Sequence, residues 1–141
     1  WSDPCVARDF VYSIVAPELW AVDIKTGRWA WNYSLGYTGS PSYADGIVYA
    51  IAGQELIAHD ALTGRILWTF RGDAPGVGYA IIAAGHVYFS TSSSVYALDA
   101  KSGQQKWSDI NSGGGHLTIS QGRLLVAQTN GVLKAYELTQ P

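Results

Sequence analysis

The sequence predicts an all-β protein, a β-propeller with three complete four-stranded antiparallel blades and a fourth blade that lacks its outer strand. The main observation is a motif, Ala-x-Asp-x-x-(Thr/Ser)-Gly-x-x-x-Trp, which occurs three times in 141 residues. Its aspartates are 37 and 39 residues apart, and a degraded copy, Ala135-Tyr136-Glu137, follows 38 residues later. A constant period of this length is typical of repeat proteins. Aromatic and β-branched residues between turn signals favour strands over helices.

Each copy of the motif reads as a strand, a tight turn and a returning strand. The aspartate and the Thr or Ser can bind backbone N–H groups of the turn, and the glycine lies where the turn needs a positive φ. The small alanine leaves room for the tryptophan ring on the returning strand. The motif positions are Ala21, Asp23, Thr26, Gly27 and Trp31 in the first copy, Ala58, Asp60, Thr63, Gly64 and Trp68 in the second, and Ala97, Asp99, Ser102, Gly103 and Trp107 in the third.

Four strands are expected in each complete repeat. Residues 1–9 read as a loop and a short first strand, because residues 4–12 align with residues 41–49 and share a Pro, an Ala and a Val-Tyr pair. The second repeat predicts strands at 41–44, 47–52, 55–61 and 66–70. The later repeats predict strands at 78–83, 86–91, 94–100 and 105–110, then at 116–120, 123–128 and 132–138. The expected blade limits in this single arc are 1–37, 38–73, 74–112 and 113–141.

The alternative fold is a β-sandwich, which also has short, evenly spaced strands. A β-sandwich does not require one turn-and-tryptophan motif at a constant period, so the repeat favours the propeller. In a propeller, the connections between repeats, residues 33–40, 71–77 and 111–115, lie on the face opposite the Thr-Gly turns. Loops on rigid scaffolds often carry ligand sites, although solvated loop residues without a ligand are an equal alternative. The possible ligand-face residues are Tyr37, Arg71, Asp73, Tyr79 and His116.

The three motifs resemble the tryptophan-docking repeat of the pyrroloquinoline-quinone-like β-propellers, and the resemblance covers essentially the whole chain. It implies that Trp31, Trp68 and Trp107 pack against the next blade's peptide plane and the Ala position. The family contains quinoprotein dehydrogenases and non-catalytic propellers, such as the outer-membrane assembly lipoprotein and sensor ectodomains. Its rings usually close with seven or eight blades, so this chain would supply half of an eight-bladed ring. The resemblance also implies an extracytoplasmic location, either periplasmic or secreted.

Composition argues against several classes of function. A net charge of −2 and a pI near 5.8 give no electrostatic basis for a nucleic-acid partner. The longest apolar run, residues 79–89, is interrupted by Gly85 and His86 and is too short to span a bilayer. Cys5 is the only cysteine, so the chain lacks the adjacent cysteine pair that the resemblance implies for a quinoprotein dehydrogenase. The histidines lack metal-binding spacing, and His59 falls at a packing position, so neither a metal nor a cofactor is predicted.

These observations favour a non-catalytic scaffold that binds or assembles with other proteins through its ring faces and terminal blades. The alternative is a fragment or subunit of a quinoprotein dehydrogenase whose active site is completed by another chain. An open arc would expose an apolar sheet face at each end, which soluble monomers seldom tolerate. We therefore expect a homo-oligomer, with two arcs joined head to tail into eight blades, or a partner chain that completes the ring. A self-closed four-bladed monomer is the remaining possibility.

Overall fold

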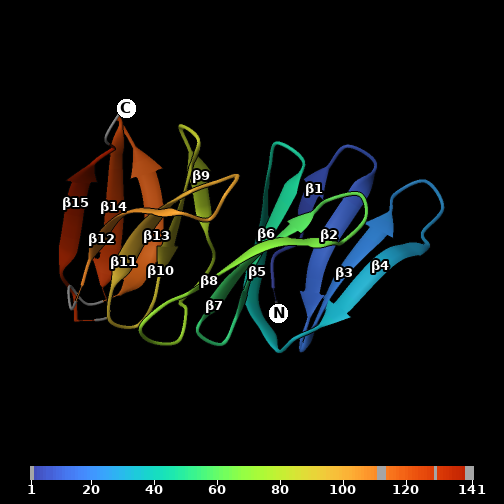
Figure 1. Cartoon of the computed structure of the whole chain (residues 1–141), viewed down its shortest axis with the longest axis horizontal. Helices are drawn as coiled ribbons and strands as arrows, with labels where there is room; N and C mark the ends of the chain where they lie inside the picture. The colour runs from blue at the N-terminus through green and yellow to red at the C-terminus, as the bar shows by residue number, and fades with distance from the viewer. Residues whose placement is uncertain (1, 111–113, 129, 139–141) are drawn as a thin grey trace.

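The computed structural model describes residues 2–110, 114–128 and 130–138. Within these residues the chain forms four antiparallel sheets, each made of strands that are consecutive in the sequence (Figure 1). Blade 1 contains β1 (Cys5–Ala7), β2 (Phe10–Val15), β3 (Glu18–Asp23) and β4 (Trp29–Ser34). Blade 2 contains β5 (Tyr37–Ala44), β6 (Ile47–Ala52), β7 (Glu55–Asp60) and β8 (Ile66–Arg71). Blade 3 contains β9 (Ile81–Ala83), β10 (His86–Ser90), β11 (Val95–Asp99) and β12 (Gln105–Asp109), and blade 4 contains β13 (Gly115–Ser120), β14 (Arg123–Gln128) and β15 (Leu133–Glu137).

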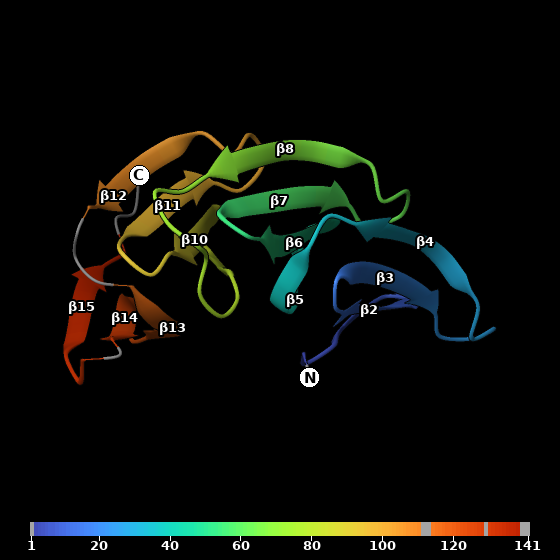
Figure 2. The ribbon, with the colours of Figure 1, turned by 90° about the horizontal axis from the view of Figure 1, so that it is seen from below.

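The predicted fold is confirmed: three sheets have four strands, and the sheet of blade 4 has the order β13-β14-β15. Figure 2 shows the four sheets along an arc, with β4, β8 and β12 on its outer rim and blades 1 and 4 at its two ends. In blades 1 to 3 the third strand pairs with an outer strand. Within the described residues β15 has no such partner, so it is an edge strand.

The hydrophobic core lies between neighbouring blades. One cluster joins blades 1 and 2, a second joins blades 2 and 3, and a third joins blades 3 and 4. Strands β6 and β7 are buried along nearly their whole length because a neighbouring blade covers each face of their sheet. Strand β2, at the end of the arc, instead alternates toward its C-terminal end between buried and more exposed side chains. Each blade thus depends on its neighbours for burial.

Strand boundaries differ from the predictions mainly at the connections between blades. The first connection was expected to span residues 33–40, but β4 ends at Ser34 and β5 already begins at Tyr37. Gly36 has a φ of 76°, and this left-handed conformation lets the chain reverse within two residues. Strand β9 begins at Ile81 rather than at residue 78, and only an isolated bridge joins Gly76 to Thr91 before it. Part of the predicted connection at 111–115 lies outside the described residues.

Candidate interaction surface

The three motif turns share one hydrogen-bond pattern. In each turn one aspartate oxygen accepts hydrogen bonds from the backbone N–H and the hydroxyl of the Thr or Ser three residues later, at 2.8–2.9 Å. These bonds, led by that of the backbone N–H, hold the pKa of each aspartate below its ordinary value. The glycines have φ values of 68°, 74° and 71°. The carboxylates of Asp23, Asp60 and Asp99 are therefore used to fix the turns.

Tryptophan docking joins blade 1 to blade 2. The indole N–H of Trp31 donates a hydrogen bond to the carbonyl of Ala61 at 3.0 Å, and the Tyr12 hydroxyl donates to the same carbonyl at 3.0 Å. The indole face covers Gly64, where an added Cβ would lie 2.7 Å from the ring. Real Cβ contacts are longer than this, so only glycine fits beneath the indole.

The interface between blades 2 and 3 repeats this arrangement. Trp68 and Tyr49 both donate to the carbonyl of Ala100, at 3.2 and 3.0 Å. A Cβ at Gly103 would lie 2.6 Å from the Trp68 ring. The tyrosines were missed by the motif reading, although Tyr12, Tyr49 and Tyr88 recur at the same period as the motif. Each docking slot therefore consists of a tryptophan, a tyrosine, one carbonyl and one glycine.

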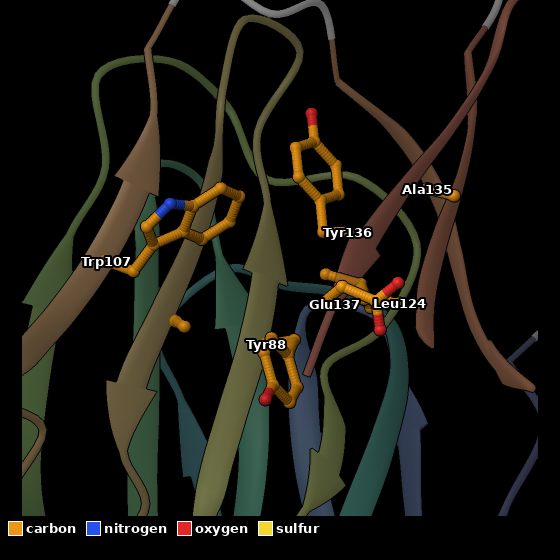
Figure 3. A pocket seen from close by; sticks show the side chains of 7 residues that line it. Tyr88, Trp107, Leu124, Ala135, Tyr136 and Glu137 are labelled. Atoms are coloured by element: carbon orange, nitrogen blue, oxygen red, sulfur yellow. The ribbon is translucent and has the colours of Figure 1, made fainter. Parts of the chain in front are cut away.

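The described residues form the third slot, between blades 3 and 4, only in part, because residue 141 holds the position of Gly64 and Gly103. Trp107 and Tyr88 occupy the corresponding positions, but neither the indole N–H nor the hydroxyl has a hydrogen-bond acceptor within the described residues. Trp107 instead packs edge-on against Tyr136, with ring centroids 4.8 Å apart. A cavity of about 330 Å³ lies beside the indole (Figure 3). It is lined by Tyr88, Ala97, Trp107, Leu124, Ala135, Tyr136 and Glu137.

His59 reinforces the first docking slot. Its side chain is fully buried and stacks on Trp31, with centroids 5.9 Å apart. Its Nδ1 lies 2.8 Å from the Gly64 carbonyl, which can only accept, so Nδ1 carries the proton and Nε2 accepts from the Tyr37 hydroxyl at 2.8 Å. Burial lowers the pKa of His59, and the neutral ring satisfies both partners. His59 is a packing residue, as its position in the repeat indicated.

Tyr37 is not the loop residue that we predicted. It lies in β5, its side chain is 0% exposed, and its hydroxyl binds His59. Desolvation raises the pKa of the Tyr37 phenol well above its ordinary range. The prediction was wrong because the reversal at Gly36 is shorter than a typical inter-blade loop, which brings Tyr37 into the sheet. Tyr37 therefore contributes to the core and presents no group to a ligand.

Two other predicted ligand-face residues, Arg71 and Asp73, form ion pairs or hydrogen bonds with side chains of this chain. Arg71 ends β8 and pairs with Glu55 at 3.4 Å. Asp73 accepts hydrogen bonds from the hydroxyls of Thr91 and Ser94, which tie the connection between blades 2 and 3 to blade 3. Burial alone would raise the pKa of Asp73, but these hydrogen bonds outweigh it and lower the pKa. Both residues thus have structural partners.

The remaining two predicted residues are exposed. Tyr79 lies in the connection before β9 and is 42% exposed. His116 lies in β13, close to Gly78: an added Cβ at that glycine would be 3.1 Å from the histidine Nδ1. Their place as ligand-face residues stays a prediction.

Blade 1 presents an exposed apolar face at one end of the arc. Val6, Val15 and Trp29 are 66%, 65% and 64% exposed, and Trp20 packs edge-on against Trp29 at 6.2 Å. The counterpart of Val15 in blade 2, by strand register, is Ala52, which is only 8% exposed. The outer face of blade 1 therefore has the composition of an inter-blade interface without a neighbouring blade.

Blade 4 presents the complementary face at the other end. Leu133 is 67% exposed, whereas its counterpart Leu56 in blade 2 is 0% exposed because blade 3 covers it. Ala135 is exposed too, and its counterpart Ala58 is fully buried. The two ends of the arc thus present the two different halves of one kind of interface.

The described part of the chain offers no evident metal-binding cluster. No group of three or more His, Cys, Asp or Glu side chains that could hold a metal is found there. Burial raises the pKa of the Cys5 thiol to about 11, which makes it a poor nucleophile at neutral pH.

Within residues 2–110, 114–128 and 130–138, the chain has no helix that is long and apolar enough to cross a membrane.

Comparisons with known proteins agree with this architecture. The structure is similar to BamB from Moraxella catarrhalis, with a TM-score of 0.82 and 21% identity over 96% of this chain and 42% of that chain. It is similar to the computationally designed protein Ika4, with a TM-score of 0.79 and 16% identity over 98% and 92% of the two chains. It is also similar to the quinohemoprotein alcohol dehydrogenase ADHIIG from Pseudomonas putida HK5, with a TM-score of 0.79 and 18% identity over 95% and 32%.

Identities this low show the fold alone, and this chain spans 42% of the length of the BamB structure. No significant match is found among curated protein sequences. The model of one family, described as outer membrane protein assembly factor BamB, matches residues 19–139. This match covers most of the chain, including all three tryptophan motifs, so the chain belongs to the family of the outer membrane protein assembly factor BamB.

Proposed function

We propose that this chain is a non-catalytic propeller scaffold that assembles with another polypeptide through the outer faces of blades 1 and 4. One observation carries this proposal: positions that are buried at the interfaces between blades within the arc are exposed at its two ends. Full burial of a large apolar side chain contributes about 1.5–3 kcal/mol, so covering these faces is strongly favourable. The partner is either a second copy of the chain or a different polypeptide that completes the ring.

The two terminal faces differ, which sets the geometry of assembly. The face of blade 4 corresponds to the face that blade 2 turns toward blade 3, and the face of blade 1 corresponds to its complement. A head-to-tail contact therefore matches unlike faces, and it closes into a ring if the rotation permits. Two copies joined in this way would give eight blades.

The family description supports a protein-binding role in outer membrane protein assembly. We extend to this chain the general part of that role, a scaffold that binds proteins, and an extracytoplasmic location. The similarity to an alcohol dehydrogenase, at 18% identity, supports the fold and carries no argument for catalysis.

Light scattering on the 141-residue chain at micromolar concentration tests this proposal. We expect one of two results. The chain forms a particle of twice its 15.2 kDa mass, or it is a monomer that binds a fluorescent dye specific for exposed hydrophobic surface. Val15→Glu, on the outer face of blade 1, should reduce assembly or dye binding. Ile24→Glu, at a residue that is 49% exposed in a motif turn, is the matched control and should change neither. A monodisperse 15.2 kDa particle without dye binding would overturn the proposal.

A second assay addresses the enzyme alternative. Addition of pyrroloquinoline quinone and calcium should produce no dye-linked oxidation of alcohols or aldose sugars. Dye reduction above a no-protein control would favour a dehydrogenase subunit instead.

A further inference from the structure

We propose that the cavity between blades 1 and 2, beside the motif turn of blade 2, binds a primary ammonium group on a short unbranched chain, such as a lysine side chain. This cavity has a volume of about 250 Å³. Pockets for drug-sized ligands measure about 300–1,000 Å³, so this one suits a single side chain or a small amine. The inference is independent of the proposed function, which concerns the outer faces of blades 1 and 4.

The charged side chains around the cavity favour a cation. Two carboxylates, Asp45 and Asp60, and one guanidinium, Arg8, line it, so its net charge is negative. Asp60 uses Oδ1 to accept hydrogen bonds from the Leu62 and Thr63 backbones and the Thr63 hydroxyl, at 2.8–3.1 Å. These bonds hold the pKa of Asp60 below its ordinary value, so the carboxylate is charged at neutral pH. Within the described residues, the Asp45 carboxylate has no ion pair or hydrogen bond.

Three aromatic rings also line the cavity. Tyr12 packs against Phe10 and Tyr43, with ring centroids 6.2 and 6.1 Å apart. Tyr12 is buried, whereas Phe10 and Tyr43 are half-buried and keep part of their surface accessible. The faces of aromatic rings attract ammonium groups. Leu62 and Leu67 add apolar wall for the methylene groups of a lysine stem.

The neighbouring cavity, between blades 2 and 3, indicates which side chain fits such a site. It has a volume of about 280 Å³, and Asp45 and Asp99 line it. Lys101, a residue of this chain, lines it too. Lys101 follows Asp99 by two residues, as Leu62 follows Asp60. The position that holds a lysine in one cavity therefore holds a leucine in the other, where carboxylates and apolar wall are present without a lysine of this chain.

Arg8 does not take the place of this lysine. No ion pair joins its guanidinium to Asp45 or Asp60, although all three side chains line the cavity. Arg8 is exposed, and its φ of 55° lies in the left-handed region that glycine adopts more readily. An anion would bind beside Arg8, whereas a cation would bind beside the carboxylates. Arg8→Gly therefore distinguishes the two kinds of ligand without straining the turn.

Binding of Nα-acetyl-lysine-N-methylamide to the isotope-labelled 141-residue chain tests the inference. The amide signals of Gly46 and Leu62, which both line the cavity, should shift and saturate during titration. Ring currents should move the ligand's Cε protons upfield. The n-butylammonium ion should bind as well, and the ratio of the two affinities distinguishes a lysine residue from a free amine. The corresponding norleucine and glutamate derivatives, which lack the ammonium group, should not bind.

Four variants identify the groups that bind the cation. Asp45→Asn, which suits the φ of 49°, should weaken binding about threefold, and Arg8→Gly should strengthen it by a similar factor. Tyr43→Leu should weaken binding, whereas Tyr43→Phe keeps the ring and should keep the affinity. Asp3→Asn, the same charge change at the opposite end of β1 from Arg8, is the control and should have no effect. Circular dichroism checks that each variant is folded.

Each outcome decides the question. Binding of the glutamate derivative, or weaker lysine binding in Arg8→Gly, would overturn the inference in favour of an anion site. Equal binding of the norleucine derivative would reduce the site to an apolar hollow, and no saturable shift at high millimolar ligand would leave no site at all. Light scattering tests assembly through the outer faces separately, so either proposal can fail while the other stands.

Discussion

Replacing Gly64 with alanine separates the contribution of tryptophan docking from that of turn geometry. Gly64 and Gly27 hold the same position in two copies of the motif and have φ values of 74° and 68°. They differ in what lies above them. A Cβ on Gly64 would be 2.7 Å from the Trp31 ring, whereas a Cβ on Gly27 would meet nothing within 4 Å. Gly27→Ala is therefore a matched control for Gly64→Ala.

The expected magnitudes follow from these contacts. A non-glycine residue in the left-handed region costs about 1–2 kcal/mol, and both variants should lose this much unfolding free energy. Gly64→Ala should lose about 1–3 kcal/mol more, because the methyl group forces the indole away from its packed position. For a chain of this size, each kcal/mol lowers the melting temperature by about 4 °C. Gly64→Ala should therefore melt clearly below Gly27→Ala.

Urea unfolding followed by far-UV circular dichroism measures both free energies, and a double-mutant cycle identifies the cause. In a Trp31→Ala background the extra cost of Gly64→Ala should disappear, because the clashing ring is gone. Equal destabilisation by the two alanine variants, or an unchanged cost without Trp31, would refute the reasoning that the indole face requires glycine.

Three further predictions follow from the same contacts. Trp68→Ala should destabilise the protein by about 3–5 kcal/mol, and Trp107→Ala by clearly less in urea unfolding, because a cavity already lies beside Trp107. Tyr37→Phe should cost about 1–3 kcal/mol, because it leaves the buried Nε2 of His59 without its donor, and an unchanged melting temperature would contradict this. Since burial puts the folded-state pKa of His59 below the unfolded value near 6.5, the unfolded state takes up its proton first. Stability should therefore fall as pH drops below about 6.5, by up to about 1.4 kcal/mol per pH unit, and His59→Gln should weaken this dependence.

The sequence by itself determined the turns, the strand order and the role of glycine. These features are local: Asp60, Thr63 and Gly64 lie within five residues of one another, and their hydrogen bonds form inside one turn. A motif repeated at a fixed period therefore predicted the blades, and most strand limits fell within one or two residues of the observed ones. Family membership agrees with the resemblance that the motif indicated.

Tertiary structure decided the features that depend on which side chains meet across blades. Tyr37 looked like a loop residue because the contact of its hydroxyl with His59, 22 residues away, forms only when β5 and β7 come together in the sheet of blade 2. The shared acceptor carbonyl of Ala61 joins residues 30 and 49 positions apart, and no local pattern contains that geometry. Trp31 and Trp107 are identical in the motif, yet the indole N–H of Trp31 donates to the Ala61 carbonyl of the next blade, whereas a cavity lies beside Trp107. Local hydrogen bonds within each turn explain the repeated motif residues. The packing of each blade against its neighbour decides which motif tryptophans are docked.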